Sequence, residues 1–302
     1  MTAAGTDSAP WTIARLLDWT RAHFARHQLE APRLCAELLL AHALGCERIH
    51  LYTRHDETPG PVVLETFRAL VRQAAAGRPI AYLTGTKEFF ALPLEVTADV
   101  LIPRPETEIL VERTIDLVRR APGPRRILDL GTGSGCIAVA LARHLPDATL
   151  LASDVSAAAL AVARRNAARH GVAERIEFRV GDLFEPWRAP PTALCDIVVC
   201  NPPYIATRGA SVAPQVRDHE PHVALFAGPD GLDVIRRVLA EAPAWLTPGG
   251  HLLLEMGFDQ AAAVVRLAAA PAWCEPAVYR DGAGHARVLH VRAAAADAAR
   301  VA

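Results

Sequence analysis

Short apolar runs alternate with helical stretches from position 126 almost to the end of the chain, and this alternation restricts the fold more than any other feature. Five runs have the length and composition of buried parallel strands: residues 127–130, 149–152, 176–180, 196–200 and 251–255. The stretches between them are rich in alanine, a strong helix former. Because parallel strands are joined by helical crossovers, the pattern predicts an α/β fold with one mostly parallel sheet.

Two local signals refine this sheet. Ser156 is a suitable N-cap, and Gly171 a suitable stop, for the helix that follows the second predicted strand. Near the end of the chain, residues 277–280 and 287–292 flank the turn-rich segment 281–284. This arrangement predicts a C-terminal antiparallel hairpin.

The first part of the chain has a different pattern. Between Trp11 and Ala76 apolar residues recur at helical spacing, so we expect residues 1–84 to form a small all-helical domain. Residues 85–103 alternate apolar with smaller or polar side chains, which suits a β-hairpin linker. Residues 104–302 then form the α/β domain, and a chain of 302 residues is long enough for both domains.

Composition argues against several classes of protein. The formal net charge is −1, from 32 basic and 33 acidic residues, so the overall charge attracts neither nucleic acid nor an acidic membrane. The six cysteines include no Cys-x-x-Cys pair, and we expect neither a disulfide framework nor a metal site. The N-terminus does not resemble a signal peptide, and no apolar run reaches the roughly 20 residues of a membrane span. We therefore expect a cytoplasmic protein without a membrane partner.

A glycine-rich turn follows the first predicted strand. It consists of Gly131, Thr132, Gly133, Ser134 and Gly135, and residues 136–144 can continue as a helix. Glycines let the backbone approach a ligand closely, and the N-terminus of a helix favours a carboxylate or phosphate. An ordinary strand-to-helix turn would contain similar residues, so the interpretation depends on the residues after the later strands.

Acidic residues follow the next two predicted strands. Asp154 ends the second strand, where a carboxylate can accept hydrogen bonds from both hydroxyls of a ribose. Asp182 follows the third strand and could accept from the exocyclic amine of an adenine, with Leu183 and Phe184 against the face of the ring. A solvated strand-end aspartate, or a cap or turn residue, is the structural alternative.

The glycine spacing bears on which cofactor is bound. Dinucleotide sites have the spacing Gly-x-Gly-x-x-Gly, whereas this chain has Gly-x-Gly-x-Gly followed by Cys136. The spacing resembles that of the class I methyltransferases, enzymes with a Rossmann-like sheet. This resemblance implies that S-adenosyl-L-methionine is the cofactor and that its methionine end lies at the glycine turn.

The fourth predicted strand runs directly into Asn201, Pro202, Pro203 and Tyr204, at the sheet edge where open α/β folds bind ligands. The prolines stiffen this loop and remove N–H donors, so it presents mainly acceptors. The Asn201 side-chain oxygen and the Pro202 carbonyl can accept the two hydrogens of a planar NH₂ group, while Tyr204 packs on its flat face. We predict these four residues as the catalytic set; a Pro-Pro turn that merely ends a strand is the alternative.

The chemistry explains why an acceptor loop is needed. The nitrogen of a carboxamide or of adenine is a poor nucleophile because its lone pair is delocalised. Holding both hydrogens aims the nitrogen at an activated methyl group and favours the positive charge that develops during transfer. Positioning and electrostatics can therefore replace a strong base.

The joint order of these motifs resembles the HemK-type release factor glutamine methyltransferases, which methylate the glutamine of the Gly-Gly-Gln motif in peptide-chain release factors. Further landmarks are residues 82–85, 88–89, 101–108, 220–221 and 228–232, with Glu106 where the family usually has aspartate. The resemblance implies release factors as partners and a helical N-terminal domain that helps to bind them. The candidate cofactor-binding residues are Gly131, Thr132, Gly133, Ser134, Gly135, Asp154, Asp182, Leu183 and Asn201.

Three other functions compete with this interpretation. An N6-adenine methyltransferase of DNA or RNA would act on the same kind of NH₂ group, but residues 1–84 contain nine arginines, no lysine and eight acidic residues, which is not the basic surface that base flipping requires. A glutamine methyltransferase of a ribosomal protein is a closer rival, and only the N-terminal resemblance separates it. A cofactor-binding module without chemistry is disfavoured by the intact tetrapeptide at Asn201.

Overall fold

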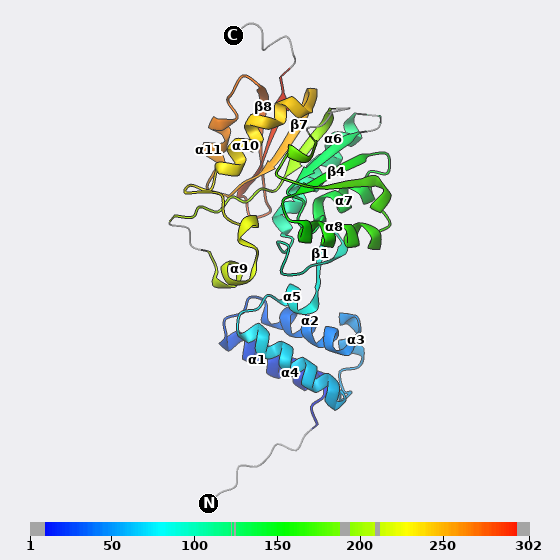
Figure 1. The fold of residues 1–302 in the computed structure, drawn as a ribbon. Helices are drawn as coiled ribbons and strands as arrows, with labels where there is room; N and C mark the ends of the chain where they lie inside the picture. Colours follow the sequence, from blue (N-terminus) through cyan, green and yellow to red (C-terminus); the bar gives the residue numbers. More distant parts are fainter. Residues whose placement is uncertain (1–9, 122, 124, 188–193, 209–211, 295–302) are drawn as a thin grey trace, which may run out of the picture. The chain divides into compact units, whose positions relative to one another are not determined.

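The computed structural model describes residues 10–121, 123, 125–187, 194–208 and 212–294. The chain divides into two compact units (Figure 1). The first comprises Met1–Gly85 together with Pro214–His219, and the second comprises Thr86–Ala213 and Glu220–Ala302. Each unit has an apolar core of its own.

The first unit is helical, as the sequence predicts. Thr12 caps its first helix by accepting a hydrogen bond from the Arg15 amide, and prolines open the second and fourth helices, where an N–H donor is not needed. The apolar faces of the helices pack around the fully buried rings of Phe24 and Phe67. The helices are α1 (Ile13–Arg26), α2 (Pro32–Leu44), α3 (Arg48–Thr53), α4 (Pro61–Ala75) and α5 (Ile80–Thr84). The short helix α9 (Pro214–His219), from later in the chain, belongs to the same unit.

A hairpin begins the second unit. Strands β1 (Thr86–Phe89) and β2 (Leu92–Glu95) pair in the antiparallel direction, which confirms the hairpin expected in residues 85–103. Its two turn residues, Phe90 and Ala91, have φ angles of 50° and 57°, values that match the twist of a tight two-residue hairpin turn. Phe89 and Leu94 are buried in the core of the α/β unit, so the hairpin is part of that unit.

The α/β unit is built on a seven-stranded sheet in the order β5-β4-β3-β6-β7-β9-β8. The neighbours from β5 to β7 are parallel, whereas β9 is antiparallel to both β7 and β8. The predicted parallel strands and the C-terminal hairpin are therefore confirmed. The strands are β3 (Arg126–Leu130), β4 (Thr149–Asp154), β5 (Ile176–Val180), β6 (Cys195–Cys200), β7 (Leu246–Glu255), β8 (Trp273–Arg280) and β9 (Ala286–Ala293).

Helices cover both faces of this sheet (Figure 1). One face packs against α6 (Glu108–Arg120), α7 (Cys136–His144) and α8 (Ala157–Arg169), and the other packs against α10 (Asp233–Glu241) and α11 (Ala261–Leu267). Burial on both faces explains why the central strands are continuously apolar instead of alternating. Short 3₁₀ turns lie at Pro105–Thr107, Ala173–Arg175, Glu185–Trp187, His222–Ala224 and Ala242–Trp245.

None of the helices in the described ranges combines the length and the apolar character that crossing a bilayer requires.

The helix predicted after the second strand begins as expected, because the Ser156 hydroxyl accepts a hydrogen bond from the Ala159 amide. This cap holds the start of α8 at the carboxyl end of β4.

Asn166 ties three parts of the α/β unit together. Its side chain lies on α8 and is completely buried. The amide oxygen accepts from the Glu95 N–H at 2.7 Å, while the amide nitrogen donates to the Glu95 carbonyl at 3.0 Å and the Ser134 carbonyl at 2.9 Å. One side chain thus fixes the end of the hairpin and the glycine turn against α8.

Replacing Asn166 should therefore destabilise the fold. Asn166→Ala leaves one buried and two partly buried backbone groups without this partner, at about 1–3 kcal/mol for each buried group, so we expect a loss of about 3 kcal/mol in the free energy of unfolding. Urea denaturation measures this quantity. Gln73→Ala, which removes a half-buried amide on α4, is the control and should change stability by less than about 0.5 kcal/mol. A loss as small as that of the control would contradict the bridging role of Asn166.

Candidate active site

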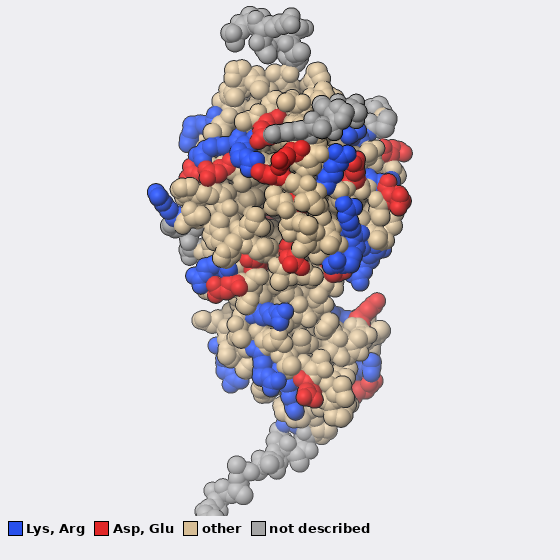
Figure 2. Space-filling model, in the orientation of Figure 1, with Lys and Arg blue, Asp and Glu red and all other residues tan. Residues whose placement is uncertain are grey.

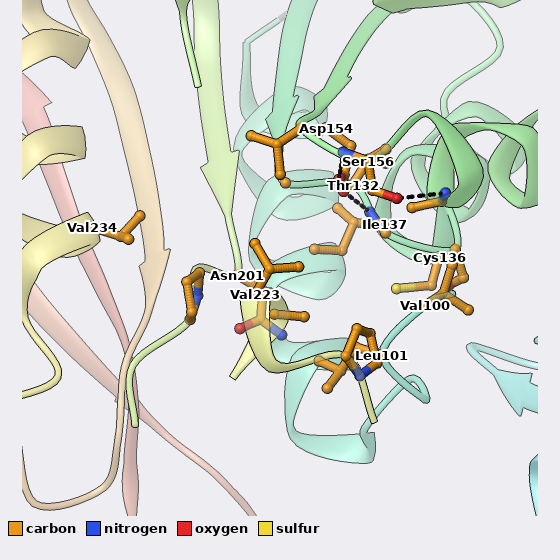
Figure 3. A pocket seen from close by; sticks show the side chains of 18 of the residues that line it. Val100, Leu101, Thr132, Cys136, Ile137, Asp154, Ser156, Asn201, Val223 and Val234 are labelled. Carbon is orange, nitrogen blue, oxygen red and sulfur yellow. Dashed lines mark hydrogen bonds between the residues drawn. The ribbon is translucent and has the colours of Figure 1, made fainter. Parts of the chain in front are cut away.

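A cavity of about 410 Å³ opens at the carboxyl edge of the sheet. Strand β3 lies between β4 and β6, so the order of the sheet reverses there, and such a switch point leaves a crevice beyond the strand ends. The loops after β3, β4, β5 and β6 all line the cavity. Residues from segments 99–107 and 221–226, with Val234 and Arg237, complete the lining, and Figure 3 labels Leu101, Val223 and Val234 among the residues around the cavity.

The glycine turn lies between β3 and α7, where the sequence predicts it. Gly131 and Gly133 have φ angles of 67° and 55°, which L side chains rarely adopt, and the space beside each Cα is open. Both line the cavity, as do Thr132 and Ser134. Gly135 does not line the cavity. It faces α8 instead, where a Cβ would lie only 3.0 Å from the Ala163 Cβ. The last glycine of the motif therefore serves helix packing.

Asp154 ends β4 and faces the cavity beside this turn (Figure 3). Its Oδ2 accepts from the Gly133 N–H at 2.8 Å, and its Oδ1 accepts from the Ser156 N–H at 2.9 Å. Burial raises the pKa of this carboxyl, and the two backbone hydrogen bonds partly offset the effect. Each oxygen keeps a further acceptor position, so a fixed carboxylate can still accept from a pair of ligand hydroxyls.

The loop after β5 differs in part from the expected arrangement. Asp182 lines the cavity, but its carboxylate also forms an ion pair with Arg237 of α10 at 2.8 Å. Leu183 lines the cavity with a φ of 48°, and its carbonyl accepts from the Ser153 hydroxyl at 2.9 Å. The expectation that Phe184 lies against an adenine ring is wrong. Phe184 is fully buried and stacks on Trp245, with ring centroids 5.6 Å apart.

Asn201 lies directly after β6 and lines the same cavity as the glycine turn and Asp154. Its amide nitrogen donates to the Thr107 hydroxyl at 3.0 Å. Figure 3 shows the oxygen and nitrogen of the amide pointing apart. With the nitrogen tied to Thr107, the oxygen is the end of the amide that is left for a ligand.

The other three residues of the tetrapeptide occupy different environments. Pro203 lines the cavity, whereas Pro202 is buried and Tyr204 is not among the lining residues. The Tyr204 ring packs against the apolar core on the α10 and α11 face, and its hydroxyl lies 3.4 Å from Oε1 of Glu255. Burial raises the pKa of the Tyr204 phenol, so it remains protonated at neutral pH.

A second segment, residues 225–231, packs against residues 204–207 and forms hydrogen bonds with their backbone. Ile205 donates to the Leu225 carbonyl at 2.9 Å, Ala227 donates to the Ile205 carbonyl at 3.0 Å, and Thr207 donates to the Gly228 carbonyl at 2.9 Å. Gly231 lies so close that a Cβ would be 2.3 Å from the Tyr204 carbonyl oxygen. This contact explains why the segment 228–232 contains glycine.

Gln260 completes the support of the loop. Its side-chain nitrogen donates to the Tyr204 carbonyl at 3.0 Å, and its side-chain oxygen accepts from the Gly257 N–H at 2.9 Å. The backbone after Asn201 is thus bonded on more than one side before any ligand arrives.

Two buried carboxyl groups lie on the same face of the sheet. Burial raises the pKa of Asp129, on β3, to about 7, although the Thr132 hydroxyl donates to it at 2.6 Å. Burial likewise raises the pKa of Glu255, at the end of β7, to about 7, and the nearby Thr107 hydroxyl opposes this shift. Glu255 therefore lies beside both Thr107 and Tyr204, next to the strand that ends immediately before Asn201.

Sequence reasoning gave no role to several of these residues. Thr107 and Arg104 belong to a landmark of the family resemblance, and Glu220 to another, yet their contacts join positions far apart in the chain. The buried Glu220 carboxylate forms an ion pair with Arg104 and accepts from the Ile102 N–H at 3.1 Å. An acidic residue closing an apolar strand was the available signal for Glu255.

In the parts of the chain that the structure describes, no group of three or more His, Cys, Asp or Glu side chains is arranged to hold a metal ion. The residues around the cavity do fit a nucleoside with a charged tail. Asp154 offers acceptors, the open glycines admit a ligand to the backbone, and the N-terminus of α7 favours a carboxylate.

Comparisons with known proteins agree with this geometry. Residues 15–85 match the family described as PrmC N-terminal domain, and residues 107–217 match the methyltransferase small domain. The methyltransferase match confirms that the chain is an enzyme and supports S-adenosylmethionine as its cofactor. A methyltransferase structure from Pyrococcus furiosus has the same fold, with a TM-score of 0.50, 17% identity, and coverage of 75% of this chain and 98% of that one.

Curated relatives match almost the whole chain. The release factor glutamine methyltransferase of Geobacter sulfurreducens is 43% identical over 92% of this chain and 96% of its own length. The enzyme of the same name from Rhodopirellula baltica is 40% identical over 97% of this chain and 100% of its own. From the amino-terminal helices to the C-terminal hairpin, this chain belongs to the release factor glutamine methyltransferase family.

Proposed function

We propose that this enzyme transfers the methyl group of S-adenosylmethionine to the side-chain amide nitrogen (N5) of the glutamine in the Gly-Gly-Gln motif of peptide-chain release factors. The names of the relatives support release factors as substrates. The placement of Asn201 carries the proposal: it lines one cavity with the glycine turn and Asp154, and its amide nitrogen is tied to Thr107. Such a reaction belongs in the cytoplasm, where release factors act.

The cofactor end of the cavity is formed by Asp154 and the glycine turn. We assign the Asp154 carboxylate to the ribose hydroxyls, and the backbone of residues 131–134 with the N-terminus of α7 to the methionine end. When bound, the cofactor supplies a methyl group activated by a sulfonium. Leu183 and Asp182 lie on the adenine side, with Asp182 shared between this role and its ion pair with Arg237.

The acceptor end is formed by the loop after β6. We assign the two hydrogens of the glutamine amide to the Asn201 oxygen, which lines the cavity, and to the backbone carbonyl of Pro202, whose side chain is buried; Pro203 borders the cavity beside Asn201. Both acceptors would favour the positive charge that grows on nitrogen as the N–C bond forms and the bond between the methyl group and the cofactor sulfur breaks; the surplus amide hydrogen would then pass to solvent as a proton. Tyr204 supports this loop from the core side through its contact with Glu255.

The helical domain, residues 1–84, is proposed to recognise the release factor, and residues 104–302 are proposed as the methyltransferase domain. Residues 85–103 connect the two along the chain, and their hairpin packs into the core of the α/β unit. Large apolar side chains on the helical unit support this role because they are exposed: Trp19, Ile49, Tyr52 and Val62. Basic and acidic side chains lie among each other on the face shown in Figure 2, which is unlike a surface made for nucleic acid.

Methyl transfer from labelled S-adenosylmethionine distinguishes the candidate substrates. Release factor, ribosomal protein and DNA are offered in parallel, and we expect label on the release factor alone. A release factor with the Gly-Gly-Gln glutamine replaced by alanine is the control and should stay unlabelled. Label on DNA alone, or on the ribosomal protein alone, would overturn the assignment.

Asn201→Ala should abolish most turnover without releasing the cofactor. Removing one preorganised hydrogen-bonding group that acts on developing charge lowers kcat by about 10²- to 10³-fold. Because Asn201 is assigned to the acceptor, the Kd of S-adenosylmethionine, measured by calorimetry, should stay within about twofold. An equal loss of cofactor affinity would mean that Asn201 acts on the cofactor instead.

Asp154→Ala should have the opposite signature. The loss of charge-assisted hydrogen bonds to the ribose raises the Kd of the cofactor by about 10- to 100-fold. Asp147→Ala, at an exposed position just before β4, removes the same group without touching the cavity. Calorimetry that gave the same Kd for both variants would disprove the ribose role of Asp154.

A further inference from the structure

Thr107 lies beneath Asn201 and has no assigned part in the reaction. It ends the 3₁₀ turn that leads into α6, and it is 1% exposed. Its hydroxyl accepts from the Asn201 amide nitrogen at 3.0 Å across 94 positions of sequence. Because this buried hydroxyl binds the nitrogen end of the amide, it constrains the orientation of the amide as well as its position.

The constraint concerns which end of Asn201 faces the substrate. The two ends of an asparagine amide have nearly the same shape, and rotation of the terminal torsion by half a turn exchanges them. If the nitrogen faced the cavity, its hydrogens would oppose the hydrogens of the acceptor NH₂ group. Only a hydrogen-bonding partner on the far side of the amide can select the productive orientation.

The surroundings of Thr107 supply this selection. A threonine hydroxyl has a single hydrogen, and Thr107 has Asn201 on one side and Glu255 on the other. Glu255 is 1% exposed, and its Oε2 is buried without a hydrogen-bonding partner among the described residues. The Asn201 nitrogen can only donate, so the Thr107 oxygen is the acceptor in their 3.0 Å hydrogen bond.

We propose that Thr107 is a positioning residue for methyl transfer: by accepting from the Asn201 nitrogen, it holds the Asn201 oxygen toward the amide that is to be methylated. The proposal rests on the proposed function, in which that oxygen accepts a hydrogen of the glutamine amide.

Substitution of Thr107 tests the proposal. Thr107→Val keeps the branched shape but removes the hydroxyl, so we expect kcat for release factor methylation to fall about 10- to 100-fold. The Kd of S-adenosylmethionine should stay within about twofold. Thr107→Ser keeps the hydroxyl and should retain kcat within about threefold of the native enzyme.

Thr114→Val is the matched control. Thr114 is also fully buried but lies on α6, where its hydroxyl donates to the Leu110 carbonyl at 2.7 Å, away from Asn201. This variant should leave kcat unchanged. Thermal melting of every variant, and the double variant Thr107→Val with Asn201→Ala, complete the set; the double variant should be no slower than Asn201→Ala alone.

The outcomes separate this inference from the function on which it rests. If Asn201→Ala is inactive while Thr107→Val has native kcat, the positioning role is wrong and the proposed function stands. If Asn201→Ala keeps native turnover, the acceptor site itself is misassigned. Should Thr107→Val fail to fold, Thr107→Ser decides: native kcat supports the role of the hydroxyl, and a loss of 10-fold or more in a folded protein overturns it.

Discussion

The parallel alignment of β3, β4 and β6 is the constraint on which the site depends. Parallel strands end at one edge, so the loops that follow them must meet there. The glycine turn, Asp154 and Asn201 are 70 positions apart from first to last, yet each is the continuation of a strand in this set. A cofactor and an acceptor can therefore be brought together by the sheet itself, and the other segments around it complete the cavity.

Features that depend on local sequence could be predicted. Residues close in the sequence determine the apolar runs, the Ser156 cap and the glycine turn. The structure has all three at the expected positions. Contacts across long separations could not be read in this way. Phe184 stacks on Trp245 instead of facing a ligand, and Asp182 meets Arg237. An aromatic or acidic residue after a strand has the same local pattern whether its partner is a ligand or a distant helix.

The chain contains two asparagines, Asn166 and Asn201, and both exploit the same property of the amide group. In each, the amide nitrogen donates hydrogen bonds and the amide oxygen can only accept them. Because the amide group is planar, a hydrogen bond to one end also fixes the direction of the other. Asn166 binds the backbone with both ends and is completely buried, so it is not available to a ligand. Asn201 has its nitrogen engaged by Thr107, and so its oxygen is oriented before a substrate is present.

The bonds that surround residues 204–207 have a consequence for recognition. Leu225, Gly228 and Gln260 already satisfy backbone groups of this segment, and the two prolines before it have fixed φ angles. A segment with so little conformational freedom loses almost no entropy when a guest arrives. This segment is ordered when the α/β unit folds and not when the substrate binds. More of the contact energy of a glutamine side chain therefore remains as binding free energy, which favours tight and selective binding.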